Sequence, residues 1–397
     1  MLLTKIQTGE IIMKNLKKLL ALLLALTMLL SMAACGDTAA QNSGGGNGEG
    51  TAPTTTDPEN AGASEAQSLI DAGKYQEAYD KLMALENPTE EEKALLKCFR
   101  FMPLKADYSD GESTETVEYT YNEKGLPVSV RYSAGEEWEQ YEFTYDDRGN
   151  LLSQKGTNSD SESSSEVIYT YDDKNNQLTE THNGGWSYSY AYTYDDKGNR
   201  LTEVYTDKDG TDTYTYTYDD QGNVLSENCV YSDGRTYGNT YTYNDKNQVV
   251  TWVETNGGGT NTTTYTYDDK GNRLTETRSS NGGEPYTIAY AYTYDAKGNK
   301  LTEVCTNYDG TTTYTNTYTY DEKGNMLSEE RVYQANTYKD TYTYDQYNNP
   351  VTITVITTRN TENGTETRTT TTTATWKLCY NPRFADEEYM STSGFFS

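Results

Sequence analysis

A period-two alternation of aromatic and polar residues dominates the chain from about residue 117 to about residue 355. The segment "YTYDDKGNRLTE" at 192–203 shows the pattern, because Tyr and Thr alternate before a polar stretch and Leu, Thr and Glu follow it. Successive side chains of a β-strand point to opposite faces of the sheet, so this period predicts a strand on each side of a turn. Tyr and Thr are also strand-forming residues.

The same segment recurs ten times at spacings of 23 to 27 residues, which is typical of repeat architectures. Thr always precedes the reference tyrosine, Leu or Val always lies seven residues after it, and Ser or Thr always follows that aliphatic residue. A segment needed ten times indicates a structural unit, since a catalytic loop is normally needed once. The reference tyrosines are Tyr121, Tyr145, Tyr171, Tyr194, Tyr218, Tyr243, Tyr267, Tyr294, Tyr320 and Tyr344.

The polar stretch of each unit predicts a tight hairpin turn. Four residues after the reference tyrosine stands Gly, replaced only by Asn, which indicates a left-handed backbone. These glycines are Gly125, Gly149, Gly198, Gly222, Gly271, Gly298 and Gly324. An Asp directly after the tyrosine can accept from backbone N–H groups and start a type I turn. These residues are Asp146, Asp172, Asp195, Asp219, Asp268, Asp295, Asp321 and Asp345.

Two hairpin registers are compatible with this turn. A three-residue loop with a glycine bulge fits the Gly position but pairs Thr193 with Leu201, which mixes the two faces. A four-residue loop pairs Tyr194 with Leu201 and Thr193 with Thr202, giving one Tyr/Leu face and one Thr/Ser face. Because burial normally fixes register, we favour the four-residue loop, with Tyr and Leu inside a curled sheet.

The predicted fold is therefore mainly β: a long antiparallel meander of about ten hairpins, paired in order and curled or spiralling, because long twisted sheets rarely stay flat. A small helical segment at 64–105 precedes it, where apolar residues recur at helical spacing and Thr89 and Glu92 have the spacing of a capping box. The part "AGKYQEAYDKL" resembles one tetratricopeptide repeat. We expect this segment to cap the first edge of the sheet; a peptide-binding groove is the alternative.

The unit "YTYDDKGNRLTE" resembles the YD repeat of the RHS superfamily in residue type and order, over all ten units. The resemblance implies hairpins wound into a spiralling β-shell, which in large members encloses a toxic carboxy-terminal domain or displays adhesive surfaces. This chain is short for a cage and ends at Ser397 without such a domain, so surface display is the implied role. The aromatic strands followed by "D-x-x-G" also resemble the cell-wall-binding repeats of Gram-positive surface proteins.

The amino terminus has the features of a bacterial lipoprotein signal. Lysines at 14, 17 and 18 precede an apolar run at 19–30, and small residues then lead to Cys35. We expect translation to start at Met13 and Cys35 to become the lipidated first residue, which would hold the protein outside the cytoplasm. The predicted organisation is a signal at 1–34, a disordered linker at 35–63, the helical segment, a YD-repeat sheet at 106–385 and a tail at 386–397.

Charge and cysteine content narrow the function further. The net charge is −29, and removal of residues 1–34 leaves about −32, which disfavours binding to nucleic acid. If the strands pair in order, Cys229 and Cys305 lie too far apart for a disulfide, so we expect free thiols. Cysteine spacing matches no metal motif, and neither a metal nor another cofactor is predicted.

Candidate binding residues are those that break the repeat. The single histidine, His182, is interpreted as an exposed strand residue, and the repeated carboxylates such as Glu203 as solvated ones. The residues that break the symmetry are Trp138, Trp186, Trp252 and Trp376 and the extra tyrosines Tyr188, Tyr190, Tyr286 and Tyr290. Exposed aromatic rings can stack on sugars; the alternative is that they fill the interior of the curl.

These observations lead to one preferred hypothesis and two alternatives. We predict a non-enzymatic, lipid-anchored cell-surface protein that binds an extracellular ligand, with a glycan or another envelope component favoured over a protein. A structural spacer or scaffold without its own ligand is the first alternative. A peptide-binding helper that acts through the helical segment is the second.

Overall fold

The computed structural model describes residues 61–160, 164–334, 336–361 and 364–380. The expected signal, lipidation site, linker and tail lie outside these residues. The chain divides into two compact units: the smaller contains residues up to 108, 121–126 and those from 374, and the larger contains 109–120 and 127–373. Within the described part, no helix is both long and apolar enough to cross a membrane.

Three helices open the smaller unit: α2 (Ala61–Asp71), α3 (Tyr75–Met83) and α4 (Glu90–Lys97). The predicted capping box is confirmed, since Thr89 Oγ1 accepts from the Glu92 amide and the Glu92 carboxylate accepts from the Thr89 amide. The helical segment ends at Lys97, earlier than predicted, and a strand starts at Phe99. The ring of Tyr79 contacts Phe99 and Phe101 on that strand, with centroids 5.6 and 5.3 Å away.

The remaining elements are strands of 7 to 17 residues, in agreement with the predicted long meander. They are β1 (Phe99–Ser109), β2 (Thr114–Tyr121), β3 (Pro127–Ala134), β4 (Glu137–Tyr145), β5 (Leu151–Asn158), β6 (Ser165–Tyr171), β7 (Gln177–Asn183), β8 (Tyr188–Tyr194), β9 (Arg200–Asp207), β10 (Gly210–Tyr218), β11 (Val224–Val230), β12 (Thr236–Tyr243), β13 (Val249–Asn256), β14 (Gly259–Tyr267), β15 (Arg273–Ser280), β16 (Tyr286–Tyr294), β17 (Lys300–Thr306), β18 (Thr312–Tyr320), β19 (Met326–Tyr333), β20 (Asn336–Tyr344), β21 (Pro350–Thr361) and β22 (Gly364–Tyr380).

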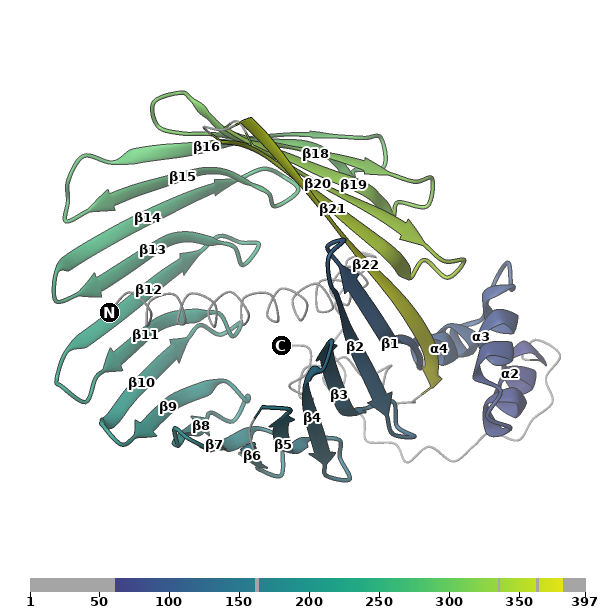
Figure 1. The fold of residues 1–397 in the computed structure, drawn as a ribbon. Helices are drawn as coiled ribbons and strands as arrows, with labels where there is room; N and C mark the ends of the chain where they lie inside the picture. Colours follow the sequence, from purple (N-terminus) through teal and green to yellow (C-terminus); the bar gives the residue numbers. More distant parts are fainter. Residues whose placement is uncertain (1–60, 161–163, 335, 362–363, 381–397) are drawn as a thin grey trace. The chain divides into compact units, whose positions relative to one another are not determined.

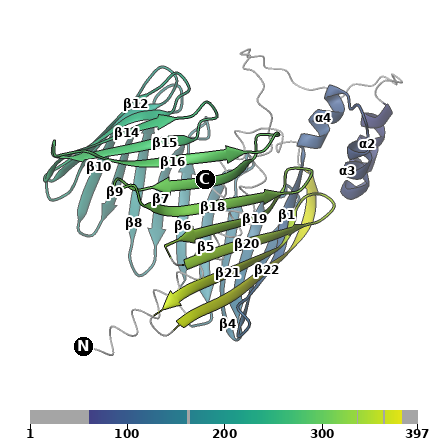
Figure 2. The same cartoon turned by 90° about the horizontal axis from the view of Figure 1, so that it is seen from above.

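Strand pairing follows sequence order. From β3 to β22 each strand pairs antiparallel with its neighbours in the chain. Figure 1 and Figure 2 both show the strands of the larger unit following one another along a curve. Strand β1 pairs with β2 and also with β22, so the meander has no free first edge. The expectation that the helices cap such an edge is therefore wrong, because hydrogen-bonded strands occupy both sides of β1.

Two kinds of turn lie at opposite edges of this sheet. The turns from even- to odd-numbered strands carry the polar stretch and are called the repeated turns; those from odd- to even-numbered strands are called the variable turns. In the repeated turn after β8, the Asp195 amide donates to the Asn199 carbonyl at 2.9 Å and the Gly198 amide to the Asp195 carbonyl at 3.2 Å. Gly198 has φ +88°, and Asn175, which replaces Gly two strands earlier, has φ +69°.

The turn aspartates act as backbone acceptors. Asp195 Oδ1 accepts from the amides of Lys197 and Asn199 at 2.8 Å, and its Oδ2 accepts from the Asn199 side chain. The Asn199 side-chain bond and then these amides lower the pKa of Asp195. The same bonds form at Asp146, Asp172, Asp219, Asp268, Asp295, Asp321 and Asp345.

The register combines both predicted loops. Tyr194 pairs with Arg200, as a three-residue loop requires, and Thr193 pairs with Thr202, as a four-residue loop requires. Leu201 is unpaired and forms a bulge in addition to the glycine bulge of the turn, so the register shifts by one residue between these two pairs. The same register shift occurs in all nine described pairs from β4–β5 to β20–β21. The predicted Thr pair is confirmed, with the hydroxyls 2.7 Å apart. The predicted pair of Tyr194 with Leu201 is wrong.

This second bulge decides which residues share the tyrosine face. Leu201 lies with the threonines and is 39% exposed, so the prediction that Leu is inside is wrong. Arg200 and Glu203 instead lie beside Tyr192, with 2.7 Å between Arg200 Nη1 and Glu203 Oε2. The equivalent Glu276 is only 3% exposed. The interpretation of these carboxylates as solvated is therefore wrong, because the bulge places them on the more buried face with a basic partner.

The reference tyrosines join one hairpin to the next. The Tyr218 hydroxyl donates to the Arg200 carbonyl, at the bulge of the preceding unit, at 2.7 Å. Tyr121, Tyr145, Tyr171, Tyr194, Tyr243, Tyr267, Tyr320 and Tyr344 make the corresponding bond. Tyr294 alone differs: its hydroxyl donates to Asp268, while Tyr292 takes the Arg273 carbonyl. These bonds satisfy carbonyl groups that the irregular register exposes.

Candidate functional site

The repeat is interrupted most visibly at the variable turn between β7 and β8. The sequence there is Asn183-Gly184-Gly185-Trp186, and Trp186 is 77% exposed, more than any other large hydrophobic residue in the described part of the chain. Two glycines precede the indole, so the turn contains little side-chain bulk before Trp186. An indole held in water at a turn has no packing role and is therefore available to a ligand.

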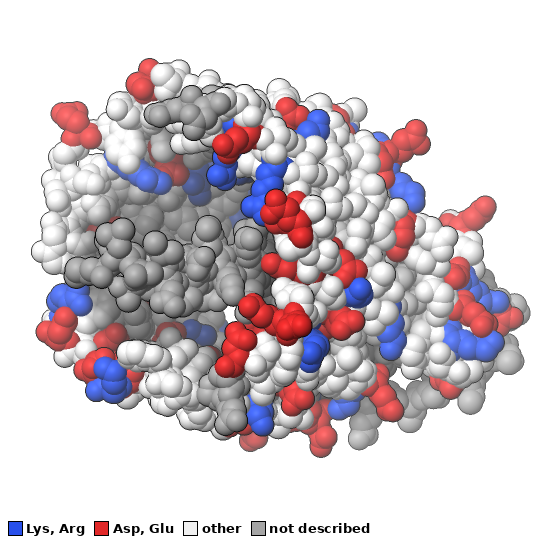
Figure 3. All heavy atoms as spheres, viewed as in Figure 1, with Lys and Arg blue, Asp and Glu red and all other residues white. Residues whose placement is uncertain are grey.

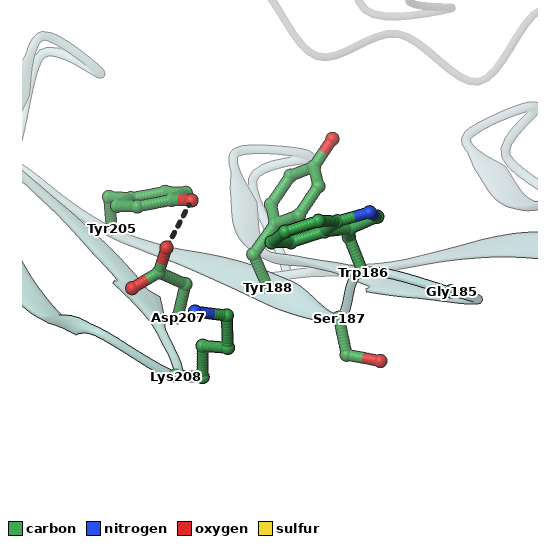
Figure 4. Close-up of a pocket in the computed structure, with 7 residues that line it drawn as sticks. All are labelled: Gly185, Trp186, Ser187, Tyr188, Tyr205, Asp207 and Lys208. Carbon is green, nitrogen blue, oxygen red and sulfur yellow. Dashed lines mark hydrogen bonds between the residues drawn. The ribbon is translucent and has the colours of Figure 1, made fainter. Parts of the chain in front are cut away.

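Trp186 borders a pocket of about 290 Å³ that we call the Trp186 pocket. Its lining comes from two adjacent variable turns and the strand ends beside them: Gly185, Trp186, Ser187, Tyr188, Tyr205, Asp207 and Lys208. Figure 4 shows the rings of Trp186 and Tyr188 overlapping in the view and the Tyr205 ring to their left, above Asp207 and Lys208. The pocket therefore combines three aromatic rings with a few polar groups.

Its charged groups already have partners. Asp207 accepts from the Tyr205 hydroxyl at 3.1 Å and from the Asp209 and Gly210 amides at 2.8 and 3.1 Å. The pKa of Asp207 is lowered, chiefly by the hydrogen bond from the Asp209 amide. Burial opposes this shift, and the Tyr205 hydroxyl and the Gly210 amide add to it. Lys208 Nζ pairs with the Asp209 carboxylate at 2.7 Å and lies 5.5 Å from the Trp186 ring centroid. Both charges of the pocket therefore have partners within the protein.

Two further rings, those of His182 and Tyr190, pack against the tyrosines that line the pocket. His182 stacks on Tyr188 with centroids 4.0 Å apart, and Tyr190 lies 5.2 Å from Tyr205. His182 Nε2 forms a hydrogen bond of 2.5 Å with Glu180 Oε1. The prediction that His182 is exposed is wrong, since its side chain is 22% exposed. The His182 ring therefore packs against Tyr188, one of the rings that line the pocket.

The other three candidate tryptophans lie elsewhere. Trp138 is half-buried with the Arg131 guanidinium 4.4 Å from its ring. Trp252 is half-buried and its Nε1 donates to Asn239 Oδ1 at 2.8 Å. Trp376 is half-buried in the smaller unit. Trp138 and Trp252 thus pack within the sheet, whereas Trp186 is presented to solvent.

Sequence reasoning identified Trp186 and Tyr188 but missed Tyr205, Asp207 and Lys208. These three lie on the return strand β9 and in the variable turn after it, and they reach Trp186 because β8 and β9 pair antiparallel in one hairpin. The four cysteines in the described residues, Cys98, Cys229, Cys305 and Cys379, are buried free thiols. No group of three or more His, Cys, Asp or Glu side chains within the described ranges could hold a metal ion.

Comparison with known families agrees with the hairpin geometry. Residues 102–227 match the Teneurin YD-shell family model, and residues 294–331 match the RHS repeat model. The chain is a YD/RHS-repeat protein. In this YD-repeat sheet the matched segments include both repeated and variable turns. A search of curated proteins found no match.

Several solved structures are similar at low identity. "Crystal Structure of TcdB2-TccC3-Cdc42" is 16% identical with a TM-score of 0.40, over 65% of this chain and 15% of that one. A porin-like protein from Bacteroides uniformis is 13% identical with a TM-score of 0.29, over 69% of this chain and 96% of that one. The Photorhabdus luminescens Tc holotoxin pore is 14% identical with a TM-score of 0.28, over 62% of this chain and 17% of that one. This chain therefore spans about 15% of the TcdB2-TccC3 chain it matches.

Proposed function

We propose that this YD/RHS-repeat protein is a non-enzymatic scaffold at the cell surface that binds an extracellular glycan in the Trp186 pocket. The observation that carries the proposal is the 77% exposed indole of Trp186 beside the rings of Tyr188 and Tyr205. A pyranose has an apolar face of C–H groups and a rim of hydroxyls. Flat rings complement the face, and the pocket's amide, hydroxyl and carboxylate groups complement the rim.

The sheet suits a scaffold because its stabilising contacts are repeated along its length. Tyrosine hydroxyls join successive hairpins, and the turn lysines add a second link, since Lys197 Nζ donates to the Asp220 carbonyl and Lys246 Nζ to the Asp269 carbonyl. Acidic and basic side chains are interspersed on the face seen in Figure 3. Such a surface keeps a repetitive β protein soluble while the variable turns are free to differ.

Glycan binding is tested with the mature full-length protein on an array of bacterial envelope glycans and neutral polysaccharides. Trp186→Ala is expected to weaken binding to the retained glycan at least tenfold, and Trp186→Phe to restore part of it because a ring remains. Tyr333→Ala is the matched control, since Tyr333 is also exposed, at 39%, and ends a strand at the variable edge. Binding unchanged in Trp186→Ala, or no binding to any glycan, overturns the proposal and favours a scaffold without its own ligand.

Attachment to the membrane is the second part of the proposal, and it rests on the sequence around Cys35. Three lysines, an apolar run and small residues precede this cysteine in the arrangement of a lipoprotein signal. Cells fed a radiolabelled fatty acid should label the wild-type protein and leave Cys35→Ala unlabelled, with that variant moving to the soluble fraction. Equal labelling of both proteins would exclude lipidation at this position.

A further inference from the structure

We propose that the glycan is a linear, uncharged polymer that also binds at a second aromatic site formed by Tyr286 and Tyr308. This inference rests on the proposed glycan-binding function and adds the class of the ligand. Both tyrosines are exposed, at 41% and 67%, and their ring centroids lie 5.9 Å apart with the planes inclined by 64°. They form an aromatic surface at the variable edge that the sheet itself does not cover.

The two sites occur in matching parts of the chain. Residues 186–210, "WSYSYAYTYDDKGNRLTEVYTDKDG", align without a gap with residues 286–310, "YTIAYAYTYDAKGNKLTEVCTNYDG". In this alignment Tyr286 replaces Trp186 and Tyr308 replaces Lys208. Trp186 and Tyr286 both lie eight residues before their reference tyrosines, and no other unit has an aromatic residue at that position.

The matching residues also meet in space. Lys208 Nζ lies 5.5 Å from the Trp186 ring centroid, and the Tyr308 ring lies 5.9 Å from the Tyr286 ring. In each case the first residue precedes or begins an even-numbered strand, β8 or β16, and the second lies in the following variable turn. Two hairpins of the same geometry therefore present ring faces at the same edge of the sheet.

The charges around the second site are also paired. Arg278, which pairs in register with Tyr286, forms an ion pair with Glu276. Asp309 accepts from the Thr311 amide at 2.9 Å and from its hydroxyl at 2.6 Å. With the charges of both sites satisfied internally and a chain charge of −29, a polyanionic glycan is disfavoured. An uncharged sugar chain needs only ring faces and hydrogen-bonding groups.

The separation of the sites selects a polymer. Strands β8 and β16 are eight strand spacings apart, which corresponds to about 38 Å along the sheet. A mono- or disaccharide cannot reach both sites, whereas a long chain can occupy both at once. Simultaneous binding raises the apparent affinity for the polymer without changing the affinity of either site for a short ligand.

The test is affinity electrophoresis of the mature full-length protein in native gels that contain hydroxyethylcellulose, mannan or soluble starch. Wild type should be retarded by at least one polymer. The double variant Tyr286→Ala/Tyr308→Ala should lose at least tenfold in apparent affinity for it. The affinity of the double variant for the matching disaccharide, which is cellobiose, mannobiose or maltose, should differ from that of wild type by less than threefold. The reason is that its Trp186 pocket is intact. Tyr333→Ala is again the control, and circular dichroism spectra establish that each variant is folded.

The outcomes separate the two proposals. If wild type is retarded, Trp186→Ala is not, and the double tyrosine variant behaves as wild type, the second site is wrong and the proposed function stands. If charged polymers such as alginate retard the protein more strongly than the neutral ones, the assignment of an uncharged ligand is wrong. If no polymer retards wild type and no disaccharide binds, the proposed function and this inference both fail.

Discussion

The repeated and the variable turns are built on the same strands and differ in what fixes them. In a repeated turn, the positions that recur have structural roles: the carboxylate of Asp195 accepts two amides, Gly198 takes a left-handed backbone, and Lys197 reaches the next turn. In a variable turn such as that of Trp186, side chains face water. The difference shows that repetition marks the structural edge of this sheet, and that candidate recognition residues lie at the opposite edge.

The largest expected difference between the edges concerns backbone strain. Gly324 in a repeated turn has φ +94°, and an added Cβ would meet no atom within 4 Å, so a substitution tests the backbone alone. Gly324→Val should cost about 2 kcal/mol, because β-branched residues are strongly disfavoured at positive φ. Gly324→Asn should cost under about 1 kcal/mol, since Asn occupies this position in three other units.

Urea denaturation measures both variants, and Gly257→Ala in a variable turn is the control. Gly257 does not have positive φ and also has open space around it, so this change should stay within about 0.5 kcal/mol. Equal costs for Gly324→Val and Gly257→Ala would contradict the assignment of strain to the repeated turns.

The tyrosine links give the second largest expected effect. Tyr218→Phe removes the hydroxyl that donates to the Arg200 carbonyl at 2.7 Å, and loss of one such bond should cost about 1 kcal/mol. Tyr308→Phe at the variable edge should leave stability unchanged, because Tyr308 is 67% exposed. Thermal denaturation of the two variants makes the comparison directly. A destabilised Tyr308→Phe would show that the variable edge is also structural.

The pKa values of two carboxyl groups, Asp321 in a repeated turn and Asp340 within a strand, are shifted in opposite directions. The pKa of Asp321 in a repeated turn is lowered: burial opposes the shift, and bonds from Asn325 and from backbone amides outweigh it. Burial first, and then the charge of Glu329, which pairs with it across the strands, raises the pKa of Asp340 to about 6. The positive charge of Arg331 lowers the pKa of Asp340, but by less than burial and Glu329 raise it. Tyr342 lies on the same face of the sheet as Asp340.

The sign of the Asp340 effect follows from its raised pKa. The native state favours the protonated acid, so the stability this group contributes is complete below about pH 4 and is lost as the pH rises to about 6. Asp340→Asn should therefore raise the free energy of unfolding by about 1 kcal/mol at pH 7, less than full conversion of the shift because solvent screens a half-buried group. Denaturation at pH 4 should show no gain. A gain of equal size at both pH values would contradict the ionisation mechanism.

The sequence predicted most of the fold because its signals are local. Gly or Asn four residues after each reference tyrosine identified the left-handed turn, and the Tyr-Thr-Tyr alternation identified the strands. The predicted face of Leu201 was wrong because the bulge at Leu201 is not marked by a particular residue type, as the glycine of the turn is. A signal did exist: Arg200 and Glu203 are three apart and pair on one face, which a regular strand does not allow.

The candidate site was predicted only in part for a related reason. Trp186 stood out as a break in the repeat, so comparison of the units was enough to find it. Tyr205, Asp207 and Lys208 lie at the far end of the same hairpin, about 20 residues along the chain, and their approach to Trp186 depends on the register between β8 and β9. That register includes the bulge at Leu201, which no residue type in the sequence identifies.

The smallest expected effect is the stability change on removing Trp186, and it separates the site from the scaffold. Trp186 is 77% exposed, so Trp186→Ala removes little buried apolar surface and should change the free energy of unfolding by less than about 0.5 kcal/mol. Loss of glycan binding in a variant with wild-type stability would then reflect a lost contact. A cost above about 1 kcal/mol in thermal or urea denaturation would show instead that the indole holds the β7–β8 turn in place, and the variable edge would join the repeated turns as a structural feature.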